Sequence, residues 1–362
     1  MANIQRRQTI RNFKTIDRPS AGDTTETMLD RRTFLQSLAG ITASTLTTTN
    51  SGRAANPESD RWGALLPKRR LGKTGKEVTM LALGGAHVNT FASHAQGLIE
   101  TAMEGGVRFF DTAALYGDGA SEKLYGQYLV PKYREDVFIL SKAHLHTKTD
   151  VKRLLDRTLL NLKTDYLDLW LMHQVMDVND ANTRIENGVL DAFIEAKQSG
   201  KVRHIGFSGH RDPAAHLRVL ERTDIFEACQ MPISCADVSY GSFIKSVLPI
   251  LLKRQMGVIA MKTLAAGGFF GGTTWFRSGD KPKICPDLIS IKDSIHFSWS
   301  MPVSVLVTGA NDPDMLKEKI EFARSFVEMT EEKKKELIDK VSHLTANAGV
   351  EFYKAKNLVN PA

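Results

Sequence analysis

The sequence predicts an α/β protein built as a closed barrel of eight parallel strands, and three observations indicate this fold. Short apolar runs recur along the chain, and amphipathic segments with a helical period separate them. Continuous apolar strands that alternate with helices are typical of a parallel sheet covered by helices. Eight such repeats within about 250 residues fit a (β/α)8 TIM barrel better than an open doubly wound sheet.

The elements follow in order from an N-terminal hairpin within residues 68–85. Strands are predicted at residues 79–84, 107–111, 137–142, 167–173, 202–207, 228–231, 257–261 and 304–308. Helical periodicity is clearest at residues 150–162, 189–199, 244–254 and 312–324. Residues 325–362, which include the charged segment EEKKKELIDKVSHL, predict extra C-terminal helices outside the barrel or across one end. The open dinucleotide-binding sheet predicts GxGxxG after its first strand, whereas this junction reads GGAHVN.

Composition excludes several classes of function. A hydrophobic share of 42% with 25% charged residues is typical of a soluble globular protein, and no apolar run reaches the length of a membrane span. The net charge of +7 is concentrated in residues 1–54, and the rest of the chain has no basic stripe for nucleic acid. Cys229, Cys235 and Cys285 follow no metal or disulfide spacing, so neither a zinc site nor a disulfide framework is expected.

Residues 1–54 resemble a twin-arginine export signal. Arg31 and Arg32 precede a mildly apolar stretch that ends in small residues near Ala54. The alternative is a disordered basic tail. The signal predicts cleavage near Ala54 and the twin-arginine export machinery as a partner. It also predicts export of the protein, which in a bacterium leads to the periplasm. If the signal is not used, the protein is expected to stay in the cytoplasm. Residues 55–66 are then a linker, and residues 67–362 form the barrel.

Polar side chains end three successive predicted strands. Asp111, Lys142 and His173 terminate the second, third and fourth strands, and Tyr116 follows Asp111 by five residues. Each alone has an ordinary structural explanation, such as a helix cap or a rim lysine. Because consecutive strands of a barrel are neighbours and its sites form at their carboxyl ends, these four side chains should converge at one mouth.

This group of side chains suits proton donation to a carbonyl oxygen. A tyrosine keeps its proton at neutral pH, and a nearby lysine ammonium should lower its pKa and ease transfer of the proton. Asp111 can pair with Lys142, and His173 can hydrogen-bond the carbonyl oxygen. The group contains no strong nucleophile, no metal cluster and no source of electrons, so a reduction requires a cofactor.

The motifs around these residues resemble the aldo-keto reductase family over about residues 65–325. FFDTAALYGDGASEKLYG (109–126), ILSKA (139–143) and LWLMHQ (169–174) match its signature segments. The resemblance implies a catalytic tetrad of Asp111, Tyr116, Lys142 and His173. It implies hydride transfer from NAD(P)H to an aldehyde or ketone, possibly one like a sugar, with Tyr116 as general acid.

The resemblance also implies cofactor contacts, with NADP expected and NAD as the alternative. They fall at Gly85, Ser208, Gln230, Met261, Lys262, Gly309, Ala310, Glu318 and Lys319. Three positions depart from the family: Gly209 stands where an asparagine is usual, Met261 replaces a stacking tyrosine, and Met315 replaces an arginine common in NADP-preferring members. Lys319, one turn on, can substitute for that arginine. The helix that follows residue 312 is expected to bind a phosphate at its N-terminus.

Other functions remain open at this point. A nucleotide-binding sensor or subunit can share the fold, although it needs no proton donor. A sugar hydrolase requires paired carboxylates, and Asp111 has no such partner. The substrate pocket is expected from residues 174–188 and from 271–287 with the glycines that precede them, where Phe269, Phe270 and Trp275 either cover a substrate or anchor the loop. The sequence indicates no oligomeric state.

Overall fold

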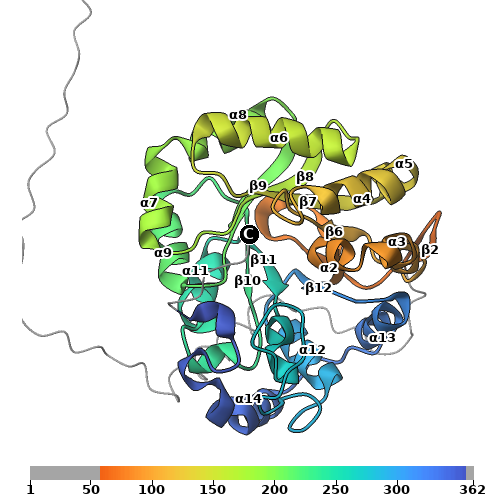
Figure 1. Cartoon of the computed structure of the whole chain (residues 1–362), viewed down its shortest axis with the longest axis vertical. Helices are drawn as coiled ribbons and strands as arrows, with labels where there is room; N and C mark the ends of the chain where they lie inside the picture. The colour runs from red at the N-terminus through yellow and green to blue at the C-terminus, as the bar shows by residue number, and fades with distance from the viewer. Residues whose placement is uncertain (1–57, 356–362) are drawn as a thin grey trace, which may run out of the picture. The chain divides into compact units, whose positions relative to one another are not determined.

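A closed barrel of eight parallel strands forms the centre of the computed structural model, which describes residues 58–355 (Figure 1). Each strand pairs with its neighbours in the chain, and the last pairs with the first through Leu306 and Leu81. The strands are β5 (Leu81–Gly84), β6 (Phe109–Asp111), β7 (Phe138–Ala143), β8 (Leu167–Met172), β9 (Val202–Ser208), β10 (Ala228–Pro232), β11 (Gly257–Met261) and β12 (Val305–Thr308). The predicted (β/α)8 TIM barrel is confirmed.

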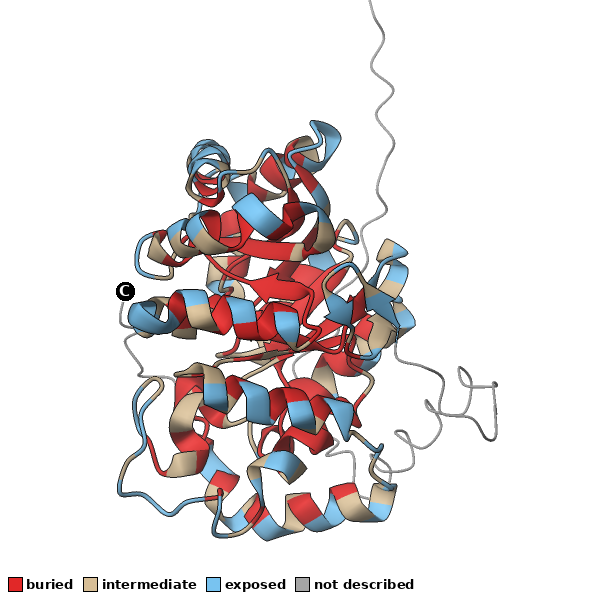
Figure 2. Cartoon of the chain, turned by 90° about the vertical axis from the view of Figure 1, so that its right-hand side faces the viewer, coloured by how far each residue is buried: buried red, intermediate tan, exposed pale blue. Residues whose placement is uncertain are grey.

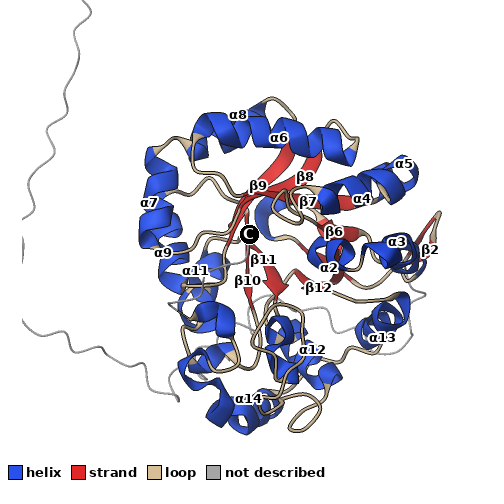
Figure 3. Ribbon diagram, viewed as in Figure 1, coloured by secondary structure: helices blue, strands red, loops and turns tan. Residues whose placement is uncertain are grey.

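Helices surround the strands in a ring (Figures 1 and 3). The longer helices are α3 (Ala95–Glu104), α4 (Ala120–Tyr128), α6 (Lys148–Leu162), α7 (Val178–Glu186), α8 (Val189–Gln198), α9 (Pro213–Arg222), α12 (Ile291–Trp299), α13 (Pro313–Arg324) and α14 (Glu331–Thr345). The shorter ones are α2 (Gly85–Thr90), α5 (Val130–Tyr133), α10 (Phe243–Ser246) and α11 (Leu248–Lys253). Helix α14 is the extra C-terminal helix that the sequence predicts.

Local sequence explains where these helices begin and which face they bury. The Thr147 side chain accepts the Asp150 backbone N–H and caps α6, which ends at Lys163 in the left-handed conformation. The buried positions of α6 recur at helical spacing and are Val151, Leu154, Leu155, Thr158 and Leu162. Figure 2 shows the same arrangement elsewhere, with buried strands inside and helices that are exposed on one side only.

One predicted helix is broken. The apolar period at residues 244–254 is divided into α10 and α11 at Val247. Pro249 accounts for the break, because its nitrogen donates no hydrogen bond and its ring clashes with the carbonyl group four residues earlier.

A hairpin closes the amino-terminal end of the barrel. Strands β3 (Lys68–Arg70) and β4 (Glu77–Thr79) pair antiparallel, as predicted. Leu71 and Val78 from this hairpin join the barrel core, which also contains Ala82, Phe109, Leu140, Leu169, Leu171, Ala228, Ile259 and Val305. The core therefore fills that end, and polar side chains gather at the carboxyl ends of the strands.

The described part of the predicted linker is paired and packed. Strands β1 (Ser59–Asp60) and β2 (Gly63–Ala64) form a second hairpin. Arg108 Nε donates to Asp60 Oδ2 at 2.7 Å, and Trp62 packs edge-on against Tyr133 with ring centres 4.8 Å apart. Residues 58–66 therefore belong to the folded unit. The predicted export signal at residues 1–54 lies outside the described residues.

Among the helices of residues 58–355, none combines the length and the apolar content that crossing a membrane requires.

Candidate active site

The ammonium group of Lys142 holds the predicted tetrad together. Its Nζ lies 2.9 Å from Asp111 Oδ1 and 2.8 Å from Asp111 Oδ2, and it donates to the Thr112 carbonyl oxygen at 2.7 Å. The Tyr116 hydroxyl lies 3.3 Å away from the same ammonium. Asp111 and Lys142 are almost fully buried, so each charge depends on the other for its stability.

His173 completes the group from the end of β8. Its ring meets the Tyr116 ring edge-on, with centres 5.8 Å apart and planes at 89°. The backbone N–H of His173 donates to the Ala143 carbonyl at 2.7 Å, which ties the end of β8 to β7. The side-chain Nδ1 is buried and has no hydrogen-bond partner within the described protein. The structure therefore brings together all four residues that the sequence predicts.

Burial sets the protonation states of the site. Burial first, and then the charge of Asp111, raises the pKa of Tyr116 well above 10. The net shift is therefore opposite to the lowered pKa that the sequence suggested, because burial dominates in the free site. Burial, followed by the charge of Lys142, lowers the pKa of His173 well below its usual value. At neutral pH the site therefore holds a protonated tyrosine and a neutral imidazole.

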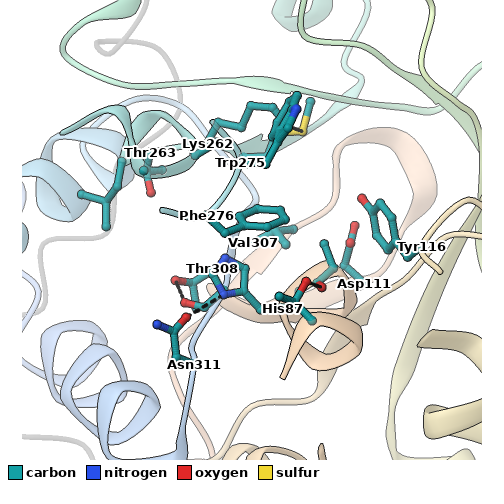
Figure 4. A pocket seen from close by; sticks show the side chains of 18 of the residues that line it. His87, Asp111, Tyr116, Lys262, Thr263, Trp275, Phe276, Val307, Thr308 and Asn311 are labelled. Atoms are coloured by element: carbon teal, nitrogen blue, oxygen red, sulfur yellow. Dashed lines mark hydrogen bonds between the residues drawn. The ribbon is translucent and has the colours of Figure 1, made fainter. Parts of the chain in front are cut away.

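A cavity of about 580 Å³ opens beside Tyr116 and His173 (Figure 4). Its wall includes seven of the predicted cofactor and phosphate positions, namely Gln230, Met261, Lys262, Gly309, Met315, Glu318 and Lys319. Asp111 lines it as well, whereas Lys142 lies behind Asp111 and Tyr116. Lys142 can therefore act on a ligand only through its neighbours.

Three predicted cofactor residues do not reach this wall. Gly85, Ser208 and Ala310 are buried outside it. The Ser208 hydroxyl donates to the Met172 carbonyl at 3.4 Å. A Cβ on Gly85 would lie 2.4 Å from Ser121 Oγ, so close packing between α2 and α4 accounts for this glycine. Their contacts with a cofactor stay predictions.

Gln230 offers a free acceptor beside the tetrad. Its Nε2 donates to Asp111 Oδ2 at 2.8 Å, whereas its Oε1 is buried and has no hydrogen-bond partner among residues 58–355. A buried amide oxygen of this kind is costly unless a donor reaches it. It therefore marks a position where a ligand N–H would be stabilised.

A second cationic centre lies at the other end of the cavity. The Lys319 ammonium donates to the Gly309 carbonyl, and burial lowers its pKa to about 8. His87 Nδ1 and Asn311 Oδ1 lie 3.1 Å apart nearby, and burial lowers the pKa of His87 to about 4, with a further contribution from Lys319. His87 and Asn311 were not among the predicted site residues, although both are polar and follow strands β5 and β12 closely in the chain.

The N-terminus of α13 is partly occupied by its own side chain. Asp312 Oδ1 accepts the Met315 backbone N–H at 2.9 Å, and Pro313 has no N–H to offer. A phosphate here meets fewer free donors than the sequence suggested, and it meets the Asp312 carboxylate as well. Lys319 is therefore the main positive group at this end.

The long connection between β11 and α12 forms much of the remaining wall. Phe270, Trp275 and Phe276 line the cavity from this connection. Phe269 does not, because it is fully buried and its carbonyl accepts the Ile284 and Cys285 backbone N–H groups, so it anchors the loop. From the other predicted loop, residues 174–188, only Gln174 reaches the wall.

The closed barrel, with polar side chains and a cavity at the carboxyl ends of its strands, fits an oxidoreductase. The chain belongs to the aldo/keto reductase family, which residues 80–346 match. Among relatives, the uncharacterized oxidoreductase YqkF of Bacillus subtilis (strain 168) is 27% identical over 304 residues, which span 75% of this chain and 95% of YqkF.

Solved structures share the fold at lower identity. The holo form of the aldo-keto reductase AKR11C1 from Bacillus halodurans superposes with a TM-score of 0.64 at 21% identity, covering 76% of this chain and 96% of that protein. An aldo-keto reductase from Klebsiella pneumoniae in complex with NADPH gives a TM-score of 0.59 at 20% identity, with coverage of 77% and 96%.

Proposed function

We propose that this protein reduces an aldehyde or ketone with NAD(P)H, and that Tyr116 is the general acid. The observation that carries this proposal is the chain of contacts from Asp111 through Lys142 to the Tyr116 hydroxyl, beside a neutral His173 at a deep cavity. A binding protein has no evident use for a proton donor held in this way.

The described residues fit a nicotinamide dinucleotide. Gln230 Oε1, which no group in the described part of the chain contacts by a hydrogen bond, can accept an amide N–H near Tyr116. Met261 offers an apolar contact for a ring, and Lys319 can hold a phosphate at the far end. When bound, the cofactor supplies the hydride. NADP is the favoured form because of Lys319, and NAD remains the alternative. The NADPH complex of the Klebsiella pneumoniae structure, which shares this fold, supports a nicotinamide cofactor and does not distinguish NADP from NAD.

The side chains divide the proton chemistry between them. Tyr116 stays protonated at neutral pH and gives its proton to the substrate oxygen as charge develops there. The Lys142 ammonium then stabilises the tyrosinate that remains, and Asp111 fixes that ammonium in place. His173 is neutral and offers an imidazole N–H to orient the same oxygen.

Two measurements on one variant pair test this assignment. Tyr116→Phe should lose carbonyl reduction while its dissociation constant for NADPH stays within a few-fold of wild type, because the ring remains and only the proton donor is removed. Turnover is followed by NADPH absorbance with a panel of aldehydes, ketones and keto-sugars, and binding by protein fluorescence. Tyr128→Phe on α4, outside the cavity, is the matched control.

The same experiment separates the alternative function. A nucleotide-binding sensor would bind NADPH tightly and show no single-turnover hydride transfer to any carbonyl in stopped flow. If Tyr116→Phe turned over accepted substrates at nearly the wild-type rate, Tyr116 would not be the acid.

A further inference from the structure

Glu122 is a buried acid that the proposed chemistry does not use. It lies in the first turn of α4 and is 0% exposed. Its Oε1 accepts the Ser141 hydroxyl at 2.7 Å, and its Oε2 accepts an amide N–H of Asn161 at 3.1 Å. Within residues 58–355, no side-chain nitrogen of a lysine, arginine or histidine lies within 4.0 Å of this carboxylate.

The other buried carboxylates of the described residues each contact a cation. The pairs are Asp111 with Lys142, Asp168 with Arg134, and both Asp237 and Glu351 with Lys354. A buried carboxylate without a cation is costly, and a neutral glutamine could accept the same hydrogen bond from Ser141. The charge of Glu122 is therefore compensated from beyond its direct contacts.

Lys142 lies on the opposite face of the strand that Glu122 contacts. Ser141 and Lys142 are consecutive on β7, and consecutive side chains of a strand point to opposite faces. Lys142 contacts Asp111 and Tyr116 inside the barrel. Ser141 instead contacts Glu122 on the outside, where α4 and α6 pack against each other (Figure 1). Glu122 therefore lies behind Lys142, with the wall of the barrel between them.

The electrostatics of the two groups agree with this arrangement. Burial lowers the pKa of Lys142, whereas Asp111 and then Glu122 raise it. Burial raises the pKa of Glu122, while its hydrogen bonds and the charge of Arg157 oppose the rise. The first turn of a helix also favours a negative charge. Because Glu122 and Lys142 are both buried, solvent screens their attraction only weakly.

Few charges surround this pair. Those that act on Glu122 come from Arg157 on α6 and Lys142 on β7, and Arg157 is nearly half exposed and paired with Asp118 at 3.1 Å. The titratable groups around Lys142 are Asp111 and Tyr116 beside it, His173 after β8, Lys262 after β11, and Glu122. Within this set, only the two carboxylates favour the ammonium form.

We propose that Glu122 is a positioning residue of the reaction, which holds Lys142 in its ammonium form from the outer side of β7 and so sets the upper pH limit of carbonyl reduction. Asp111 makes the direct contact with Lys142, and Glu122 adds a second negative charge. Glu122 does not line the cavity, so it acts only through Lys142. The inference rests on the proposed function, because it concerns the lysine that stabilises the tyrosinate.

The pH dependence of kcat tests this role. Glu122→Gln removes the charge and keeps the size of the side chain, so Lys142 should lose its proton at lower pH. Its kcat should fall about fivefold or more at about pH 9, and stay within about twofold of wild type at about pH 6, as should its dissociation constant for NADPH. Glu135→Gln, which removes an exposed negative charge, is the matched control.

Two further variants separate the charge from the hydrogen bonds. Asn161→Asp combined with Glu122→Gln moves the carboxylate across the same hydrogen bond, because the new glutamine amide can donate to the new aspartate. This double variant should recover the alkaline activity. Ser141→Ala removes a hydrogen bond but leaves the carboxylate, so its alkaline limb should stay in place.

A titration without turnover measures the same effect on Lys142. Nitrogen NMR on protein with isotope-labelled lysine follows the Lys142 Nζ signal, which is assigned by its absence from Lys142→Met. This signal should titrate at lower pH in Glu122→Gln than in wild type. An unchanged titration, or a loss of kcat that is equal at both pH values, would overturn the inference. If the wild type reduced no carbonyl, the proposed function would fail, while the titration would still decide the role of Glu122.

Discussion

Replacing Lys354 with methionine should destabilise the barrel by about 3–5 kcal/mol near neutral pH. The Lys354 ammonium lies 2.7 Å from Asp237 Oδ1 and 2.5 Å from Glu351 Oε2, and it donates to the Tyr240 carbonyl at 3.0 Å. All three charged side chains are essentially inaccessible. The substitution keeps an apolar side chain of similar length but leaves two buried carboxylates without their cation.

The loss should depend on pH in a defined direction. Burial, with a further contribution from Asp237, raises the pKa of Glu351 to about 6, although Lys354 opposes the shift. A carboxyl group whose pKa is higher in the folded state than in the unfolded chain destabilises the fold progressively as the pH rises from the unfolded pKa to the folded pKa. In the wild type this loss of stability is complete above about pH 6. Without Lys354 the pKa rises further. The deficit of the variant should then keep growing above pH 6, by at most about 1.4 kcal/mol per pH unit.

Urea unfolding at about pH 6 and about pH 8 measures this deficit, and calorimetry should show the thermal midpoint falling by roughly 5–10 °C. The control is Lys340→Met on α14, where the pair with Glu336 is nearly half exposed and should contribute little to stability. A deficit no larger than that of the control, or one that does not change between the two pH values, would refute the reasoning.

Three further predictions concern catalysis, cofactor choice and export. Lys142→Met should lose turnover while its affinity for NADPH stays within a few-fold of wild type, because Lys142 does not line the cavity. A fluorescence titration beside an activity assay checks this prediction, and normal turnover would contradict it. Met315→Arg should shift the NADPH-to-NADH affinity ratio toward NADPH by about 1.5–3 kcal/mol, since an arginine at the cavity wall can hold the 2′-phosphate; an unchanged ratio removes Met315 from that contact. Changing Arg31 and Arg32 to lysine should abolish export in a twin-arginine host, as judged by fractionation, and wild-type export of that variant would disprove the proposed signal.

The sequence was sufficient for the barrel and the tetrad because both depend on order along the chain. Each strand is a short apolar run that can be recognised in the sequence. Because sites in such barrels form at the carboxyl ends of the strands, Asp111, Lys142 and His173, which end successive strands, are expected to lie close together. Pro249 shows the limit of periodicity, since one residue without an N–H divides a helix that the apolar spacing makes continuous.

Features that depend on burial or on distant contacts were not predictable in this way. The rise in the pKa of Tyr116 comes mainly from desolvation, which the spacing of residues does not reveal. Ser208 matches a cofactor motif, yet its hydroxyl is directed to the Met172 carbonyl. His210 joins the cavity through Trp275 and Tyr353, which lie far along the chain, so only the folded structure shows it as part of the site.

Trp275 gives the cavity an optical signal of its own. The chain has four tryptophans. Trp170 is stacked on Phe193, Trp299 donates its indole N–H to the Met80 carbonyl, and Trp62 belongs to the β1–β2 hairpin, so Trp275 is the only one of the four that lines the cavity. Its ring faces the Lys262 ammonium and the edge of His210, both of which alter indole emission. Difference spectra between the native protein and a Trp275→Phe variant would therefore report what enters this end of the barrel without an added label.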